Sequence, residues 1–131
     1  MSIVTITQGN STEYNITAKQ GKTLQITFIW VDSDGDPINL TGYTSRMQVR
    51  KLHQATLLES YSYEPAVISL TSSSGMTITA LDGQVDIEVD ASTMAGILPG
   101  FYNYDLELVS GGGIVYELAG GVFEMKAEAT I

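Results

Sequence analysis

The chain has 131 residues, with 15 acidic and 6 basic side chains and a formal net charge of −9. This charge would repel both a phosphate backbone and an anionic membrane surface, so it argues against nucleic acid and membranes as partners. Because there is no cysteine, the sequence offers neither a disulfide framework nor a thiolate metal site.

The length fits a single domain over residues 1–131. The composition, rich in Gly, Thr, Ser, Val, Ile and Tyr, is typical of strands and turns rather than helices. The N-terminus lacks the basic start and apolar run of a signal peptide, and no long apolar segment follows. We therefore expect a protein made soluble in the cytoplasm.

The first part of the chain predicts two short strands and then a long one. Residues 3–7 and 14–18 favour short strands separated by a Gln-Gly-Asn-Ser turn. Residues 23–31 predict a long strand, because large apolar residues alternate there with other side chains. The apolar face of this strand consists of Leu24, Ile26, Phe28 and Trp30. Four such groups on one face require a second sheet to cover them.

The segment after this strand is rich in carboxylates. Asp32, Asp34 and Asp36 fall within five residues, and hard cations such as calcium prefer such ligands. In the helical calcium loop, however, the glycine follows three alternating ligands, whereas here Gly35 lies between the second and third acids. A hairpin turn accounts for every residue of this segment, including Pro37. We predict a turn and no metal site, with calcium binding left open.

The middle of the chain predicts a return arm and a variable loop. Residues 38–40 and 44–51 favour strands, the second with Met47 and Val49 on its inward face and polar residues on the other. Residues 52–65 have mixed polarity without a steady period, which is typical of a loop.

The third quarter shows a regular alternation again. Short apolar runs separated by turn residues predict strands at 67–70, 76–80 and 84–89. In the last of these, Val85, Ile87 and Val89 face inward while the acidic residues between them and after them face water. This acidic row is therefore interpreted as a solvated sheet face.

The last part predicts one helical turn and three more strands. Residues 91–95 favour a helical turn that Asp90 or Ser92 can cap. Strands are predicted at 100–109, 114–118 and 122–127, with a Gly-Gly-Gly hairpin tip at 111–113 and a Gly-Gly break at 120–121. Eight to ten short strands without crossover helices favour an antiparallel β-sandwich.

One local motif narrows the type of sandwich. The sequence Leu-Pro-Gly-Phe-Tyr-Asn-Tyr at 98–104 resembles the tyrosine corner of immunoglobulin-like domains, with Tyr102 as the corner tyrosine. Tyr104 stands where antibody domains have their second cysteine, so the motif favours an immunoglobulin-like topology and not the antibody family.

Catalytic patterns are absent from the sequence. His53 is the one histidine, it lies in the irregular segment, and no GxSxG motif exists. The Gly-rich segments lack the lysine and helix of a phosphate loop. We predict a protein that is not an enzyme, with no catalytic, cofactor-binding or metal-binding residues and no cofactor. Trp30 and the tyrosines are interpreted as core and corner residues.

Residues 21–51 read GKTLQITFIWVDSDGDPINLTGYTSRMQVRK. This stretch resembles a family of small tailed-bacteriophage proteins with the recurrent pattern GxTxxxxFxWxDxDGxPxDLTGYTxRMQVR. Residues 83–89 and 98–106 reinforce the resemblance, the latter being similar to the family's LPxGxYxYDLEL segment. The chain is similar in these segments to the N-terminal domain of phage baseplate upper proteins.

The resemblance implies an immunoglobulin-like virion protein that joins tail, baseplate, neck or fibre parts to the particle. Its expected partners are other virion proteins, namely tail, neck, fibre or capsid subunits, and self-association within a symmetric particle is left open. The expected location is the virion, after synthesis in the bacterial host. Two alternatives stay open: a capsid decoration protein on the head lattice, and a carbohydrate-binding or adhesive module that exposes aromatic residues.

Four residues match the family pattern and are expected to serve the scaffold: Phe28, Trp30, Tyr43 and Tyr102. The 52–65 loop and the 110–113 tip are the candidate contact surfaces.

Overall fold

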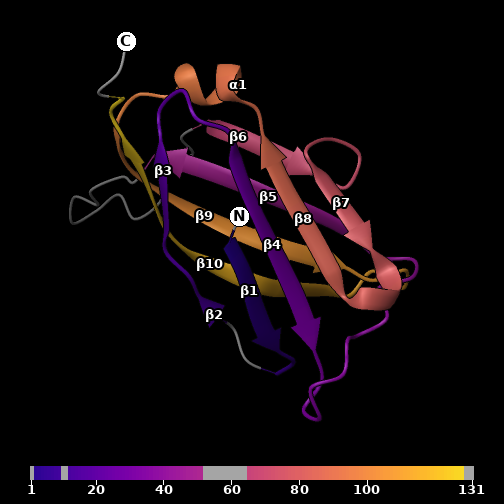
Figure 1. The fold of residues 1–131 in the computed structure, drawn as a ribbon. Coiled ribbons are helices and arrows are strands. Elements are labelled where there is room, and N and C mark those ends of the chain that lie inside the picture. The colour runs from indigo at the N-terminus through magenta and orange to yellow at the C-terminus, as the bar shows by residue number, and fades with distance from the viewer. Residues whose placement is uncertain (1, 10–11, 52–64, 129–131) are drawn as a thin grey trace, which may run out of the picture.

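The computed structural model describes residues 2–9, 12–51 and 65–128 and contains two β-sheets packed face to face (Figure 1). Sheet A has the strand order β1 (Ser2–Thr7), β4 (Leu24–Val31), β8 (Gln84–Val89) and β7 (Met76–Thr79). Sheet B has the order β2 (Thr12–Glu13), β10 (Val115–Lys126), β9 (Gly100–Val109), β5 (Thr44–Lys51) and β6 (Ala66–Thr71), and β3 (Ile16–Lys19) also pairs with β10. The prediction of a β-sandwich is confirmed.

The order of the strands is that of immunoglobulin-like domains. In those domains strands A, B, E and D form one sheet, and C, F and G form the other. Here β1, β4, β8 and β7 take the first set of places, and β5, β9 and β10 take the second. Strand β6 extends sheet B beyond β5, as the additional strands of variable-type domains do.

The N-terminal strands pair in a way that the alternation pattern did not predict. Strand β1 runs parallel to β4, and β2 and β3 run parallel to β10. All the other strand pairs of the described sheets are antiparallel. Alternation fixes which face of a strand is apolar, but it carries no information about the direction of the neighbour. The chain thus moves from sheet A to sheet B between β1 and β3 and covers one side of the sandwich (Figure 1).

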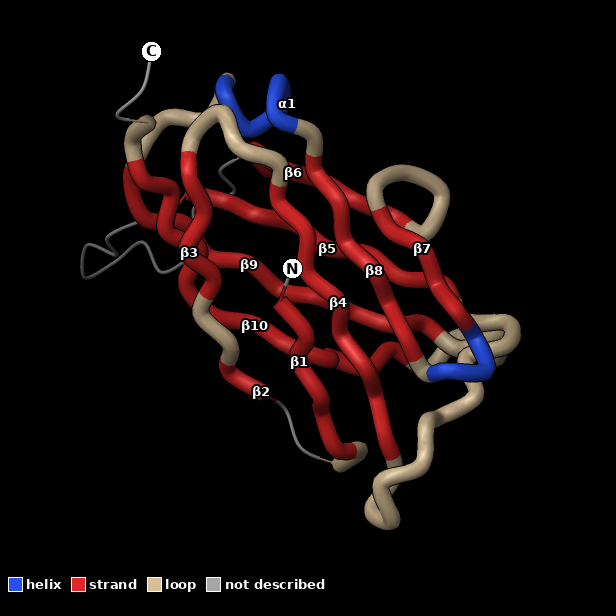
Figure 2. Tube along the Cα trace, viewed as in Figure 1, coloured by secondary structure: helices blue, strands red, loops and turns tan. Residues whose placement is uncertain are grey.

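Two short helices lie at opposite ends of the sandwich (Figure 2). Helix α1 (Ala91–Ala95) has the predicted bounds, and the Asp90 carboxylate caps it by accepting a 2.8 Å hydrogen bond from the Thr93 backbone N–H. The 3₁₀ helix η1 (Ala80–Asp82) connects β7 to β8 where the sequence predicted a turn.

The core is formed by the inward faces that the sequence predicted. Phe28 and Val85 are fully buried, Trp30 is 4% exposed, and Leu106 and Leu108 on β9 are also fully buried. In β8, Val85, Ile87 and Val89 are buried while Glu88 and Asp90 are exposed and Asp86 is half-buried. The alternating strands therefore meet across one shared apolar layer, whose burial drives the packing of the two sheets.

One predicted strand and one predicted break are wrong. Residues 38–40 form no strand, because the Ile38 N–H donates to the Trp30 carbonyl and the Leu40 N–H to the Ala80 carbonyl, which lie on different elements. Residues 114–118 and 122–127 are not two strands but parts of the single strand β10. The break expected at Gly120 and Gly121 is instead a continuous stretch that pairs with β9, beside a bulge near Leu118.

The tyrosine corner is present as predicted. The Tyr102 hydroxyl donates a 2.6 Å hydrogen bond to the carbonyl of Leu98, four residues upstream. Tyr102 is 2% exposed, and its ring packs edge-on against Phe123 with 6.4 Å between centroids. The corner thus fixes the loop before β9 to the start of that strand.

We expect Tyr102→Phe to lower the free energy of unfolding by about 1–2 kcal/mol, because it leaves the Leu98 carbonyl without its donor while the ring remains. Urea denaturation followed by circular dichroism measures this difference. Tyr43→Phe is the matched control, since Tyr43 is half-buried and no hydrogen bond of its hydroxyl is found in the described part of the chain. Equal losses in the two variants would contradict a specific role for the corner bond.

Candidate interaction surfaces

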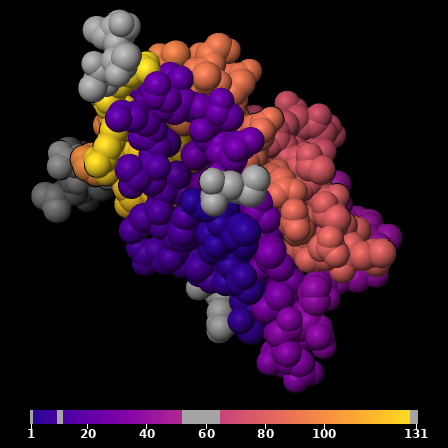
Figure 3. Space-filling view, in the orientation of Figure 1, coloured from indigo at the N-terminus to yellow at the C-terminus, as the bar shows by residue number. Residues whose placement is uncertain are grey.

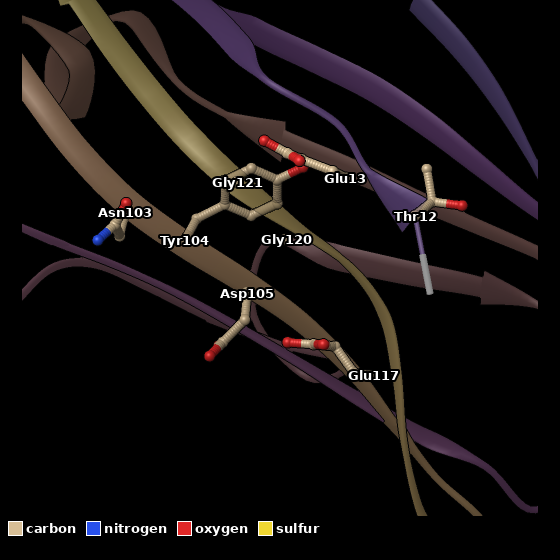
Figure 4. A pocket seen from close by; sticks show the side chains of 8 residues that line it. All are labelled: Thr12, Glu13, Asn103, Tyr104, Asp105, Glu117, Gly120 and Gly121. Atoms are coloured by element: carbon tan, nitrogen blue, oxygen red, sulfur yellow. The ribbon is translucent and has the colours of Figure 1, made fainter. Parts of the chain in front are cut away.

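A shallow hollow of about 470 Å³ lies on the outer face of sheet B (Figure 4). It is lined by Thr12, Glu13, Asn103, Tyr104, Asp105, Glu117, Gly120 and Gly121. Gly120 and Gly121 pair with Asp105 and Tyr104 of β9, and the surface is hollow there because the glycines have no side chains. A Cβ atom on Gly121 would lie 2.7 Å from Asn15 Oδ1 and 2.9 Å from the Tyr14 carbonyl oxygen. Gly121 thus lets the β2–β3 segment approach β10 closely.

The lining of this hollow is acidic. Its charged side chains are Glu13, Asp105 and Glu117, so it would repel an anionic substrate. Tyr104, the one phenol in it, donates its hydroxyl to the Tyr14 carbonyl and is held by that bond. Within the described ranges, no three His, Asp or Glu side chains are placed to hold a metal ion.

Within this hollow, the pKa of the Asp105 carboxylate is shifted by its surroundings. Partial burial, and secondarily the neighbouring Glu107, raise the pKa of Asp105, while Arg50 and Arg46 oppose the shift. Arg46 itself makes a 2.6 Å ion pair with Glu107 across β5 and β9. The ionised form of Asp105 is therefore less favourable in the folded chain than in the unfolded one.

We expect Asp105→Asn to stabilise the fold at neutral pH, by less than about 1 kcal/mol because the site is open to solvent. A raised pKa means that the folded state holds the proton more tightly, so the contribution of Asp105 to stability falls as the pH rises above about 3.9. The advantage of the variant should accordingly shrink as the pH is lowered. Thermal unfolding of both proteins across this range measures it, and a variant less stable at neutral pH would contradict the assignment.

The acidic segment after β4 forms the predicted turn and stands out from the molecule (Figure 3). Asp32 Oδ1 accepts hydrogen bonds of 3.0 Å from the backbone N–H groups of Asp34 and Asp36. The Gly35 N–H also donates to the Asp32 carbonyl, and Gly35 has a positive φ of 87°. One carboxylate oxygen thus stabilises the turn itself, which explains its place in the sequence without a metal.

The aromatic residues mostly form the interior. Trp30 packs against Tyr116 and Tyr43, with centroid distances of 5.3 and 6.3 Å, and Phe28 packs edge-on against Tyr14. Tyr102 and Tyr104 are buried, while Tyr14, Tyr43 and Tyr116 are half-buried. Trp30 and the tyrosines of the described ranges therefore present no flat, exposed aromatic patch of the kind that the carbohydrate-binding alternative requires.

Of the two candidate contact surfaces, the structure describes the 110–113 tip but not residues 52–64. Residues 52–64, with His53, lie outside the described residues, and Pro65 next to them is exposed. The 110–113 tip is a turn in which the Gly113 N–H donates to the Ser110 carbonyl, and its glycines are exposed. Ile114, directly after the tip, is 57% exposed, so apolar surface is available there.

One further surface depends on strand order and was therefore not predicted from the sequence. Three strands at the edges of the two sheets carry no charged residue: β1 (SIVTIT), β6 (AVISLT) and β7 (MTIT). Charged residues do occur on the interior strands β5, β8 and β9, and on the short edge strands β2 and β3. Edge strands leave a row of backbone groups outside the ladder, and soluble proteins commonly protect such edges with charge. The edges formed by β1, β6 and β7 lack that protection.

The helices of the described residues are short turns, and none of them is long and apolar enough to cross a bilayer.

Comparison with known proteins gives a similarity in fold. No family model and no curated protein sequence matches the chain. Among solved structures, a murine CRIg structure covers 87% of this chain at a TM-score of 0.39 and 12% identity, with 92% of its own chain matched. A family 123 glycoside hydrolase from Clostridium perfringens covers 88% of this chain and 23% of its own, at a TM-score of 0.35 and 15% identity. Neither bears on function at these scores.

A third structure matches over nearly the whole of both chains. It is the N-terminal domain of phage TP901-1 ORF48, with a TM-score of 0.55, 13% identity, and coverage of 96% of this chain and 99% of the other. In fold, the chain is therefore similar to a domain of a phage protein.

Proposed function

We propose that the chain is a non-enzymatic structural protein of a bacteriophage particle, in which it joins tail, baseplate, neck or fibre parts to the particle. The observation that carries this proposal is the match in fold to a phage protein domain along almost the entire length of both chains. The motifs at 21–51 and 98–106 resemble a tailed-phage family on separate grounds, since they are sequence patterns and not backbone shapes. Both comparisons support the same class of particle.

The chemistry of the surface supports a role without catalysis. The hollow on sheet B holds carboxylates and a phenol already bonded to backbone, and no nucleophile paired with a base lies in it. The side chains of Asp86 and Glu88 are engaged with polar neighbours, in hydrogen bonds from Thr27 and Gln25. These contacts belong to a sheet surface rather than to a reaction centre.

The uncharged edges supply a physical means of attachment. An extended segment of a neighbouring protein can add to an exposed sheet edge, where backbone hydrogen bonds give affinity and alternate side chains give specificity. Ile3 on β1 is 65% exposed and Val67 on β6 is 40% exposed, so each edge also offers an apolar contact. Repetition in a symmetric particle would strengthen individually weak contacts.

The test is the presence of the chain in purified particles. Particles from the strain that encodes it are banded in a density gradient, and the chain is detected by mass spectrometry and by immunogold labelling. We expect the chain to band with intact particles and gold to lie on tails, necks or fibres. Gold on heads alone would replace this proposal by the capsid-decoration alternative, and bare particles would refute both.

Matched variants test the attachment mechanism. Ile3→Lys and Val67→Lys place a charge on an edge strand, whereas Asn103→Lys places the same charge on β9, an interior strand, at an exposed position. We expect one or both edge variants to be depleted from particles while the Asn103 variant is incorporated normally. Normal incorporation of both edge variants would contradict attachment through β1 and β6.

A further inference from the structure

The two ends of the sandwich differ in charge, and the first of these is acidic. The acidic end consists of the 32–36 turn, η1 and the 110–115 segment, which lie together beyond the same ends of the strands (Figure 1). The Leu40 N–H bonds the Ala80 carbonyl, and a Cβ atom on Gly111 would lie 3.5 Å from the Gly42 carbonyl oxygen, so the loops contact one another. The end carries Asp32, Asp34, Asp36 and Asp82, and residues 31–43, 80–84 and 109–115 contain no Lys, Arg or His.

The opposite end gathers most of the basic residues. Lys126 of β10 pairs with Lys19 of β3, Lys51 of β5 pairs with the start of β9, and Met125 pairs with Gly100. The basic end therefore brings together five of the six basic side chains of the sequence: Lys19, Lys22, Arg50, Lys51 and Lys126. Of the acidic residues that the structure describes, Asp90, Glu124 and Glu128 lie there as well, and Glu128 makes a 2.9 Å ion pair with Lys22. Among the described residues, a positive excess therefore remains at this end of a chain whose net charge is −9.

Exposed apolar side chains occur at both ends. Of the seven large hydrophobic residues exposed in the described part of the chain, Leu81 (75%), Ile114 (57%) and Val115 (48%) lie at the acidic end. Leu98 (71%) and Phe101 (53%) lie at the basic end, where Gln20 bonds the Ile97 carbonyl and Phe101 pairs with Glu124. Each end thus has apolar groups beside charges of one predominant sign, the composition of a small protein–protein contact.

We propose that copies of this chain associate head to tail, with the acidic end of one copy docked on the basic end of the next. The two surfaces differ, so the contact is heterologous and builds rings or linear stacks rather than a closed two-fold dimer. Opposite charges orient the encounter, and Leu81 and Ile114 of one copy meet Leu98 and Phe101 of the other. The proposal is independent of the virion role, because it rests on charge and exposure alone.

Ionic strength sets the balance between the attraction of the two oppositely charged ends and the repulsion between chains that each carry a net negative charge. At about 0.15 M the Debye length is about 8 Å, so charges in direct contact between docked ends act while repulsion from the distant acidic residues is screened. At about 1 M the Debye length is about 3 Å, and the charge complementarity is largely removed. Association should therefore be strongest at moderate salt and weaken at high salt.

Two single variants block one end each. Leu81→Lys puts a positive charge at the acidic end, and Leu98→Glu puts a negative charge at the basic end, both at highly exposed positions. We expect each variant to weaken self-association about tenfold, since a contact is lost and a like charge faces the partner. Ile3→Lys tests the alternative that copies associate through a sheet edge, because Ile3 is similarly exposed but lies on the β1 edge, away from both ends.

Sedimentation velocity over a range of protein concentrations measures association, with circular dichroism to verify folding of each variant. The decisive sample mixes the Leu81→Lys and Leu98→Glu proteins. In the mixture, the unaltered basic end of one variant meets the unaltered acidic end of the other, and the two altered ends carry opposite charges. The mixture should therefore associate more strongly than either variant does alone. Three outcomes would overturn the proposal: a wild type that is monomeric at all concentrations and salt levels, a mixture that associates no more strongly than either variant alone, or self-association that only Ile3→Lys abolishes.

Discussion

Replacing Phe28 by alanine is expected to lower the free energy of unfolding by about 3–5 kcal/mol, the range for truncating a buried phenylalanine. Phe28 is completely buried on β4, between Val4 of β1 and Val85 of β8. Its ring packs edge-on against Tyr14 at 6.0 Å between centroids, so the cavity would open where the N-terminal segment crosses the core. Urea denaturation at neutral pH measures the loss. For a domain with ordinary stability of about 5–15 kcal/mol, such a change removes a large share of it.

Phe101→Ala provides the matched control, because the same atoms are deleted from a side chain that is 53% exposed on β9. We expect that variant to change the free energy of unfolding by about 1 kcal/mol or less, as is usual for surface substitutions. Comparable losses in the two variants would mean that the apolar face of β4 is not the centre of the core. Phe101 also belongs to the basic end, so its variant should be measured at low protein concentration.

Alternation was sufficient to predict the faces of the interior strands. Strands β5, β8 and β9 have the predicted bounds, and their inward residues are the buried ones, because a half-solvated strand must alternate apolar and polar groups. The cap of α1 and the tyrosine corner were also predictable, since each is a contact between residues three or four apart. Local chemistry therefore accounts for this part of the fold.

The pairing of strands was not predictable from the same pattern. The parallel pairing of β1 with β4 and of β3 with β10 depends on contacts between distant segments. Alternation of apolar and polar residues along a strand contains no information about such contacts. The continuity of β10 was missed for a related reason. Gly120 and Gly121 suggest a turn when read locally, but Gly121 is needed where Tyr14 and Asn15 approach the strand.

For the candidate surfaces too, the local motifs could be predicted from the sequence, but their positions relative to one another could not. The acidic turn and the 110–113 tip were visible as sequence motifs. That they lie at one end, opposite Lys19, Lys51 and Lys126, follows only from the register of β3, β5, β9 and β10. The absence of charge on β1, β6 and β7 likewise acquires meaning only when these strands are known to be the edges.

Replacing Gly83 by alanine is expected to lower the free energy of unfolding by about 2–5 kcal/mol, the sum of a left-handed backbone penalty and steric overpacking. Gly83 follows η1 with φ of 59°, and its carbonyl accepts a 2.8 Å hydrogen bond from the Trp30 N–H. A Cβ atom there would lie 2.5 Å from the Trp30 carbonyl oxygen and 3.0 Å from the backbone N and O of Ile38. Because these are backbone atoms, no side-chain rotation can relieve the clash.

Gly113→Ala separates the two contributions, since Gly113 also has a positive φ, 89°, but nothing lies within 4 Å of its added Cβ atom. That variant should show the backbone penalty alone, about 1–2 kcal/mol. The difference between the two variants in the free energy of unfolding, measured by urea denaturation, then gives the cost of the steric clash of the added Cβ atom with the backbone of β4 and of the 38–40 segment. Since these elements hold the acidic end together, Gly83→Ala should also weaken head-to-tail association at temperatures where the chain remains folded. If the two variants were equally stable, steric contact at Gly83 would not be the reason for glycine there, and the acidic end would have to tolerate a side chain between Trp30 and Ile38.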